Sequence, residues 1–479
     1  MAENVILGFP SVEQFRDKDL IHRSLRRTII NAFPNGGAPL TALIAWANVD
    51  PIANTKHEWM EEIYRSPSIT TRGTNPITTN APTTGDANDG TEITANDGTE
   101  ITAKTYTTAD KLYIKATSVG LLTVGDVVRF HTWNALARIT AVTPGVADNT
   151  VNGYVEVLPI RDFTVASGNL ADYAAGTSID VIGSAFEEGG HSGTPRGTRI
   201  PTFLQNQTQI FKEPFIFTGS AIKQDLEFDQ SGPYKKRAMD AARDHYVKLE
   251  KSLLFSKRSN RTITNADGSV TETRTMSGIL EFLEAWDAGS NGIMVNGQIW
   301  NPYSFKQPST TDDDPEKRII ENASGEFNID LLEKWLSNIN LYYNAKTAER
   351  LVLCGSDVMR AMSKAMRAQG SYHWEVGQKA FGLEFNKLIT AFGTLIFVTH
   401  PLFNENPIYR KSALIVDIWS INWRPLRDRD TQVRTNIQSN DFDGRKDEWL
   451  SEGTLEFWKP MNHMFIKNMS VFNPELEVD

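Results

Sequence analysis

The sequence is almost devoid of cysteine, because Cys354 is the single one in 479 residues. One thiol cannot form an intramolecular disulfide, and this usage is typical of a chain that folds in a reducing cytoplasm. The sequence also lacks the run of about 18 consecutive apolar residues that a membrane span requires. Its N-terminus has neither the basic start nor the sustained apolar core of a secretory signal. We therefore expect a soluble protein that is made in the cytoplasm and has no membrane partner.

Positive charge is also in deficit. The chain has 49 Lys plus Arg against 59 Asp plus Glu, which gives a net charge of −10 at pH 7. A protein whose main function is to bind nucleic acid carries an excess of positive charge, because Lys and Arg make the phosphate contacts. The charge therefore argues against DNA binding as the main function and leaves only weak, non-specific contact.

Metal-binding motifs are incomplete. The segment His57–Glu61 begins like the helix of a zinc protease, but that motif needs a second histidine where Glu61 stands. The Asp441–Gly444 segment resembles part of a calcium loop. The frame that puts Gly444 at the sixth position, however, puts Leu450 where the bidentate carboxylate must stand. We predict no metal site and no cofactor.

Catalytic signatures are missing too. The chain has no phosphate-binding loop, no Gly-x-Ser-x-Gly elbow and no glycine-rich dinucleotide turn. Cys354 ends an apolar strand, which favours a buried structural thiol over a nucleophile. The stretch Arg424–Asp430 interleaves acids with its arginines, which favours ion-paired surface or subunit contact over a phosphate track. A Ser, His and Asp site assembled in space stays open, but no residue nominates one, so we predict no catalytic residue and no enzyme.

A long polar, extended region is present instead. From Pro67 to Asp110 the residues Thr, Asn, Asp, Gly and Ala dominate, and an eight-residue unit occurs at Ala87–Thr94 and again at Ala95–Thr102. Two short units are too few for a solenoid, so a duplicated surface loop is favoured over a repeat-built binding face. Between Thr105 and Phe163 the alternating, β-branched residues are broken by turn signals, which predicts a small inserted β-barrel or sandwich.

The clearest helix begins at Pro233, because proline is tolerated in a first turn. Apolar residues recur after it at spacings of three and four, which predicts a single apolar face. A helix that continues to about Arg258 would be about 40 Å long. We expect its packing face to consist of Met239, Ala242, Tyr246, Leu249 and Leu253.

A compact α/β lobe is predicted from about Ile329. An amphipathic helix there is followed by the strand Leu351–Gly355, the helix Asp357–Gln369 with Ser356 as its cap, and a second buried strand at Phe392–Val398. The whole pattern predicts an α+β fold. Further strands are expected at Ala413–Trp419, Gly453–Trp458 and Met464–Phe472, with a hairpin at Thr262–Arg274.

The polar segments carry strand signals but too few apolar residues to form a core of their own. Lying across neighbouring copies of the same chain is one way to offset the entropy lost when such segments become ordered. The sequence therefore predicts an assembly protein.

The order of these elements resembles the Hong Kong 97-type major capsid proteins of tailed bacteriophages. The local sequences Asn206–Phe211, Ser277–Leu280 and Phe392–Leu395 also resemble a divergent group of that family. The resemblance covers most of the chain from about Val49 onward, and its motifs are short and of moderate specificity. It implies a major capsid protein that assembles into hexamers and pentamers, which form the icosahedral head around the double-stranded DNA genome.

The resemblance also implies a domain organisation. The inserted module departs from the minimal family pattern, and we hypothesise that it faces outward. The implied parts are an N-terminal arm (1–54, with a short helix at Asp17–Asn31), an extended loop region that overlaps a neighbour (55–229, with the inserted module at about 105–163), a peripheral domain (230–328, with its spine helix at 233–258), an axial domain (329–403) and the return strands of the peripheral domain (404–479).

The same resemblance implies the partners: other copies of the chain, a scaffold protein, a portal, a decoration protein, and packaged DNA through weak contact. No Lys and Asn pair for covalent cross-linking is assigned, and noncovalent assembly is expected. Two alternatives stay open. A phage tail or baseplate structural protein would not be expected to carry the spine helix followed by the lobe, and a cytoplasmic enzyme with a β accessory domain would need a polar pocket within 329–403.

Overall fold

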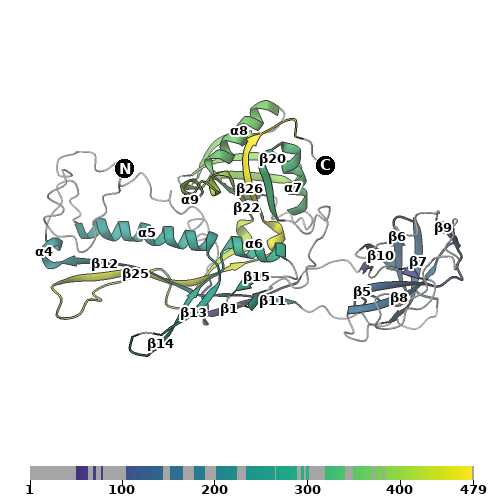
Figure 1. The fold of residues 1–479 in the computed structure, drawn as a ribbon, viewed down its shortest axis with the longest axis horizontal. Coiled ribbons are helices and arrows are strands. Elements are labelled where there is room, and N and C mark those ends of the chain that lie inside the picture. The colour runs from purple at the N-terminus through teal and green to yellow at the C-terminus, as the bar shows by residue number, and fades with distance from the viewer. Residues whose placement is uncertain are drawn as a thin grey trace. The chain divides into compact units, whose positions relative to one another are not determined.

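The structure is a computed structural model in which the chain divides into two compact units, drawn in Figure 1. Residues 62–201 form one unit, and residues 1–61 together with 202–479 form the other. The predicted arm helix Asp17–Asn31 and the tandem repeat at 87–102 lie outside the described residues. The described residues are 50–62, 68–71, 77–78, 104–143, 151–165, 177–188, 201–223, 233–264, 266–288, 293–295, 298–300, 319–339, 349–369, 374–380 and 383–476.

The unit of residues 62–201 is built on a seven-stranded sheet in which every neighbouring pair is antiparallel. In spatial order the strands are β2 (Ser68–Thr70), β10 (Ser178–Ser184), β6 (Asp126–Phe130), β7 (Ala135–Thr143), β8 (Val151–Pro159), β5 (Leu112–Ser118) and β3 (Ile77–Thr78). A further bridge joins Thr71, directly after β2, to Ala116 in β5, so the first strand of this order also meets the sixth. The sheet takes in strands on both sides of the predicted range 105–163.

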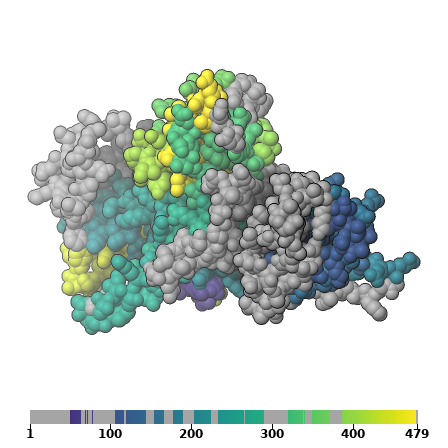
Figure 2. All heavy atoms as spheres, turned by 45° about the vertical axis from the view of Figure 1, so that its right-hand side comes forward, coloured from purple at the N-terminus to yellow at the C-terminus, as the bar shows by residue number. Residues whose placement is uncertain are grey.

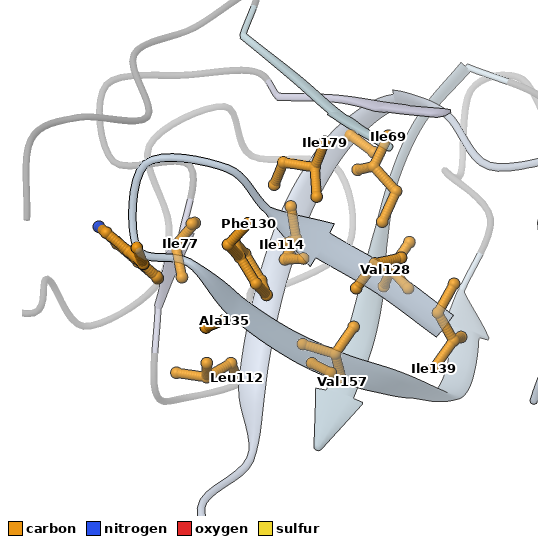
Figure 3. Packing of buried hydrophobic residues seen from close by; sticks show 14 of the residues in the cluster. Ile69, Ile77, Leu112, Ile114, Val128, Phe130, Ala135, Ile139, Val157 and Ile179 are labelled. Carbon is orange, nitrogen blue, oxygen red and sulfur yellow. The ribbon is translucent and has the colours of Figure 1, made fainter. Parts of the chain in front are cut away.

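The core of this unit follows from the two-residue period of its strands. In β7, Ala135 and Ile139 are fully or nearly fully buried, whereas Leu136 is 39% exposed. Isoleucines from four different strands point into the same interior, as Figure 3 shows for Ile69, Ile77, Ile114 and Ile179. Burial of each such side chain stabilises the unit by about 1.5–3 kcal/mol, so strands far apart in the sequence are held together by one apolar interior. The rings of Tyr106, Phe130, Trp133 and Phe163 also contact one another there.

The other unit contains the long helix α5 (Pro233–Phe255), which lies along β12 (Gln209–Thr218) and β25 (Gly444–Phe457) (Figure 1). The helix begins at the predicted Pro233 and ends at Phe255, three residues before the predicted end. β12 pairs antiparallel with β25 along its whole length. The other edge of β25 pairs with β23 (Ile421–Pro425) and β24 (Gln432–Arg434).

Two smaller elements follow the helix. The predicted hairpin is present as β13 (Ser259–Thr264) and β14 (Val270–Thr275), whose side chains are largely exposed. It leads into α6 (Ile279–Ala288), which packs close to the end of α5. A Cβ on Gly278 would lie 2.9 Å from both the Ser252 oxygen and the Ser256 nitrogen, so only glycine fits this approach.

The lobe is a seven-stranded mixed sheet with α7 (Ile329–Ile339), α8 (Ser356–Gln369) and α9 (Pro401–Glu405). The predicted strands at 351–355 and 392–398 are confirmed as β18 and β21, which pair in parallel. Two parallel and four antiparallel pairings hold the sheet together. In spatial order its strands are β17 (Ile320–Phe327), β26 (Met464–Phe472), β22 (Ala413–Val416), β18 (Glu349–Cys354), β21 (Gly393–Thr399), β20 (Leu383–Thr390) and β19 (Trp374–Ala380).

The C-terminal strands are shared between the lobe and the sheet beneath α5, which corrects the expectation that 404–479 returns as a whole to the peripheral domain. β22 and β26 pair in the lobe, while β23 and β25 pair beneath the helix. All four residues of β22 are buried, and a fully apolar strand fits only inside a sheet that is covered on both faces. Figure 2 shows the yellow atoms of the C-terminal strand among the green atoms of the lobe.

Candidate functional site

The predicted packing face of α5 is only partly the face that is buried. Leu249 and Leu253 are buried at 4% and 1% exposure, as predicted, and Ala242 is half-buried. Met239 and Tyr246 are 47% and 39% exposed, so their placement in the packing face is wrong for the single chain.

The physical reason is that polar residues occupy part of the buried face. His245 is 1% exposed, and its Nε2 lies 2.7 Å from the hydroxyl of Ser451 in β25. Tyr234 bonds Asp447 of the same strand, and the indole of Trp449 donates to the carbonyl of Ala238 at 3.1 Å. The helix is therefore rotated so that these polar contacts with β25 lie on its buried face. The spacing of the apolar residues in α5 does not indicate this rotation.

A buried polar pair joins α5 to the lobe. Nε2 of His400 lies 2.8 Å from Oε1 of Glu250, and both side chains have 0% exposure. The backbone N–H of Leu402 donates to Nδ1 of His400, so the ring hydrogen is on Nε2 and points at the carboxylate. Such a pair is costly to break, because the remaining partner would be left buried without its hydrogen bond.

A second buried histidine lies where the chain crosses between the two sheets. Nδ1 of His463 accepts the backbone N–H of Asp417, and its Nε2–H donates to the carbonyl of Trp458 at 3.2 Å. The Asp417 carboxylate accepts the hydroxyl of Ser420 at 2.8 Å. Burial lowers the pKa of His463 to about 3, so the ring is neutral at physiological pH.

One face of β25 carries a row of glutamates that are matched by arginines. Glu448, Glu452 and Glu456 follow at intervals of four residues, and all three are at most 9% exposed. Their carboxylates pair with basic residues from other segments. Two of these, Arg424 and Arg429, belong to the stretch 424–430, in which ion pairing was predicted. The partners are Arg434 for Glu448, Arg274 and Arg429 for Glu452, and Arg424 and His57 for Glu456.

The segment His57–Glu61 is a strand and not the helix that a zinc protease needs. It lies in β1 (Lys56–Glu61), which pairs antiparallel with β11 (Thr202–Gln207). His57 bonds Glu456 at 2.9 Å, and Glu61 accepts the backbone N–H of Lys459 at 3.0 Å. Burial alone would raise the pKa of Glu456, but hydrogen bonds from His57, Arg424 and Trp458 outweigh it and lower that pKa to about 2.

The structure also bears on metal binding, on the single cysteine and on membrane-spanning helices. No group of three or more His, Cys, Asp or Glu residues that could hold a metal ion occurs among the described residues. Cys354 is completely buried, and burial raises the pKa of its thiol to about 12, so it is not a nucleophile at neutral pH. No helix in the described part of the chain is both long and apolar enough to cross a bilayer.

Comparison with known proteins supplies the remaining evidence. The family model of the SU10 major capsid protein matches residues 10–470. The major capsid protein of Pseudomonas phage PaMx41 is 24% identical over 260 residues, which are 54% of this chain and 54% of that protein. The chain thus matches about half the length of this curated relative.

Two solved structures are similar to this chain at low identity. A chain of Mycobacterium phage Patience is 12% identical with a TM-score of 0.35, over 60% of this chain and 78% of that one. The capsid of Myoviridae phage XM1 is 9% identical with a TM-score of 0.33, over 78% of this chain and 88% of that one.

Proposed function

The chain belongs to the SU10 major capsid protein family, and from this premise we propose that it self-assembles into the icosahedral head of a tailed bacteriophage. Hexamers and pentamers of the chain form the shell, which encloses the double-stranded DNA. The observation that carries the proposal is the family match over residues 10–470. The role is structural, without catalysis, and the site of action is the virion after assembly in the host cytoplasm.

We assign the parts of a Hong Kong 97-type fold to this chain. Helix α5 is the spine of the peripheral domain, and the lobe that contains α7 and α8 is the axial domain around the capsomer axis. The two-stranded ribbon of β1 and β11 forms the base of the extended loop. This assignment is supported by the long helix lying on β12 and β25, and by the separate lobe that follows it in sequence.

The described surface has apolar side chains that suit contacts between copies. Met60 and Phe203 stand opposite each other in the β1–β11 ribbon and are 63% and 61% exposed. Trp419, on the crossing between the lobe and β23, is 70% exposed. Large side chains exposed to this degree in a single subunit are typical of surfaces that a partner covers, and Trp is enriched among the energetically dominant contacts.

The unit of residues 62–201 is proposed to be a small closed β-barrel on the outer face of the shell. Closure is supported by the bridge between Thr71 and Ala116, which links the first strand of the order to the sixth. A closed barrel has no open sheet edge, which is useful in a protein that must pair only with chosen neighbours. Surface labelling of intact particles should modify residues in 105–163, and protection of all of them would exclude the outward orientation.

Partners other than the chain itself are a scaffold, a portal and a decoration protein. DNA contact is weak and non-specific, which fits the net charge of −10.

Negative-stain microscopy of the purified chain, with and without neighbouring phage genes, tests the proposal. Closed shells or rings of five and six subunits are expected. Replacing Phe203 by Asp should prevent these assemblies without unfolding the subunit, because the side chain is exposed. Glu58→Gln is the matched control, since Glu58 lies on the same strand face as Met60 and is polar. Persistent monomers under every condition would contradict the capsid function, and tubes of uniform diameter would favour a tail protein.

A further inference from the structure

The chain enters and leaves the unit of residues 62–201 at opposed positions of the β1–β11 ribbon. The division between the units falls after Glu61 on the way out and before Thr202 on the way back. These two residues are direct partners in the β1–β11 ribbon. Any change in how firmly β1 is held therefore acts on both connections at once.

The buried face of β1 packs against the rest of its unit, which is called the body below. Trp59 is 8% exposed, and its ring lies 5.9 Å from that of Phe282 in α6. Glu61 is half-buried, and a single oxygen, Oε1, accepts both the Trp59 indole N–H at 3.3 Å and the Lys459 backbone N–H at 3.0 Å. Lys459 presents this N–H from a left-handed backbone conformation, with φ of 50°.

The charged side chains near Glu61 lie at the end of β25 and in the turn that follows it. Lys459 lies beside it, and Glu456 at the end of β25 is the neighbouring carboxylate. Glu456 is hydrogen-bonded to His57 and pairs with Arg424 of β23, which also pairs with Asp50. β11 contributes no charged side chain, as its sequence is TFLQNQ.

We propose that Glu61 is a proton-controlled clasp, which holds the β1–β11 ribbon on the body when neutral and loosens it when ionised. A neutral carboxyl lies among Trp59, the Lys459 backbone and Glu456 without electrostatic cost. An ionised carboxyl must give up its hydration, with the like charge of Glu456 nearby, and neither the two N–H groups on one oxygen nor the charge of Lys459 compensates for that. The clasp does not depend on the proposed capsid function.

The direction of the pH dependence follows from linkage. Burial raises the pKa of Glu61 from 4.5 to about 7, so the docked ribbon binds a proton more tightly than the released ribbon. The docked state is therefore favoured fully below about pH 4.5, and the advantage is lost as pH rises through about 7. Between about pH 6 and about pH 8 the equilibrium between docked and released ribbon should shift about tenfold toward release.

Amide hydrogen exchange on the full-length protein tests the clasp, with rates corrected for the intrinsic effect of pH. Protection of β1 and β11 should fall about tenfold from about pH 6 to about pH 8 in the wild type, while β12 and β25 keep theirs. Glu61→Gln keeps an oxygen acceptor but cannot ionise, so its ribbon should show no such fall. Glu58→Gln, on the exposed face of β1, should behave as the wild type.

Two results would overturn the proposal. One is a wild-type ribbon whose corrected protection does not change with pH. The other is a Glu61→Gln ribbon that loses protection as the wild type does, which would show that Glu61 is not the group that controls the ribbon. Unchanged protection of β12 and β25 in Glu61→Gln establishes that the variant is folded, so neither result can be attributed to misfolding.

Discussion

Gly355, between β18 and α8, provides a sharp test of how the lobe is packed. A Cβ at this position would lie 2.1 Å from the carbonyl oxygen of Arg410 and 2.5 Å from its carbonyl carbon. These are backbone atoms, so no side-chain rotation can relieve the overlap. Gly355 also donates its N–H to the Ser412 carbonyl at 3.2 Å, and a shift would weaken that bond.

The magnitude for Gly355→Ala follows from this geometry. Overpacking of a close-packed interior costs about 1–3 kcal/mol, and a clash that only backbone movement can relieve belongs at the upper end, about 3 kcal/mol. Because the chain has two units, a single free energy of unfolding is not well defined, so exchange of the β18 amides is the appropriate measurement. Protection there should fall about a hundredfold, since about 1.4 kcal/mol corresponds to a factor of ten.

Gly183→Ala is the matched control, because no heavy atom lies within 4 Å of the Cβ that would be added there. It should change the stability of its unit by no more than about 0.5 kcal/mol. Wild-type protection of β18 in Gly355→Ala would refute the argument from close backbone approach.

Three further predictions concern the buried residues. Because burial lowers the pKa of His463 from 6.5 to about 3, the unfolded chain binds this proton more readily; local stability should be full above about pH 6.5 and fall by at most about 1.4 kcal/mol per unit as pH decreases, and pH-corrected amide exchange of β22 and β26 should show this slope reduced in His463→Gln. Glu250→Ala should destabilise the lobe by about 3–5 kcal/mol because it leaves His400 buried without its acceptor, and Glu250→Gln should cost less in the same exchange measurement. Leu253→Ala should cost about 2–5 kcal/mol and Met239→Ala under about 0.5 kcal/mol in the unassembled subunit, and equal losses would contradict the observed orientation of α5.

Elements with strong local periodicity were predictable from the sequence. Helix α5 begins at the residue expected, and β18 and β21 lie where continuous apolar runs predicted buried strands. Local signals of this kind depend on neighbouring residues only. The division of the C-terminal strands between two sheets was not predictable, because strand partners are chosen by contacts between distant segments.

The polar parts of the site were missed for the same reason. His400 and Glu250 are 150 residues apart, and each is an ordinary polar residue in its own segment. His245 interrupts the apolar stripe of α5, so periodicity alone placed Met239 and Tyr246 on the buried side. The structure places His57 and Glu61 on one face of a strand with Trp59 between them, and the incomplete zinc-protease pattern did not indicate this arrangement.

The adjacency of Glu61 and Thr202 has a consequence for how such a chain can change over evolution. Directly opposed residues of an antiparallel pair have Cα atoms only about 4.5–5.5 Å apart, so the 140 residues from 62 to 201 leave and re-enter the body at almost the same spot. A stretch inserted there can be lengthened, shortened or exchanged for another domain with neighbouring termini without altering the strand register of the remainder. The β1–β11 ribbon is therefore a site at which recombination between genomes can exchange one inserted domain for another. The contacts within the rest of the chain are retained in such an exchange.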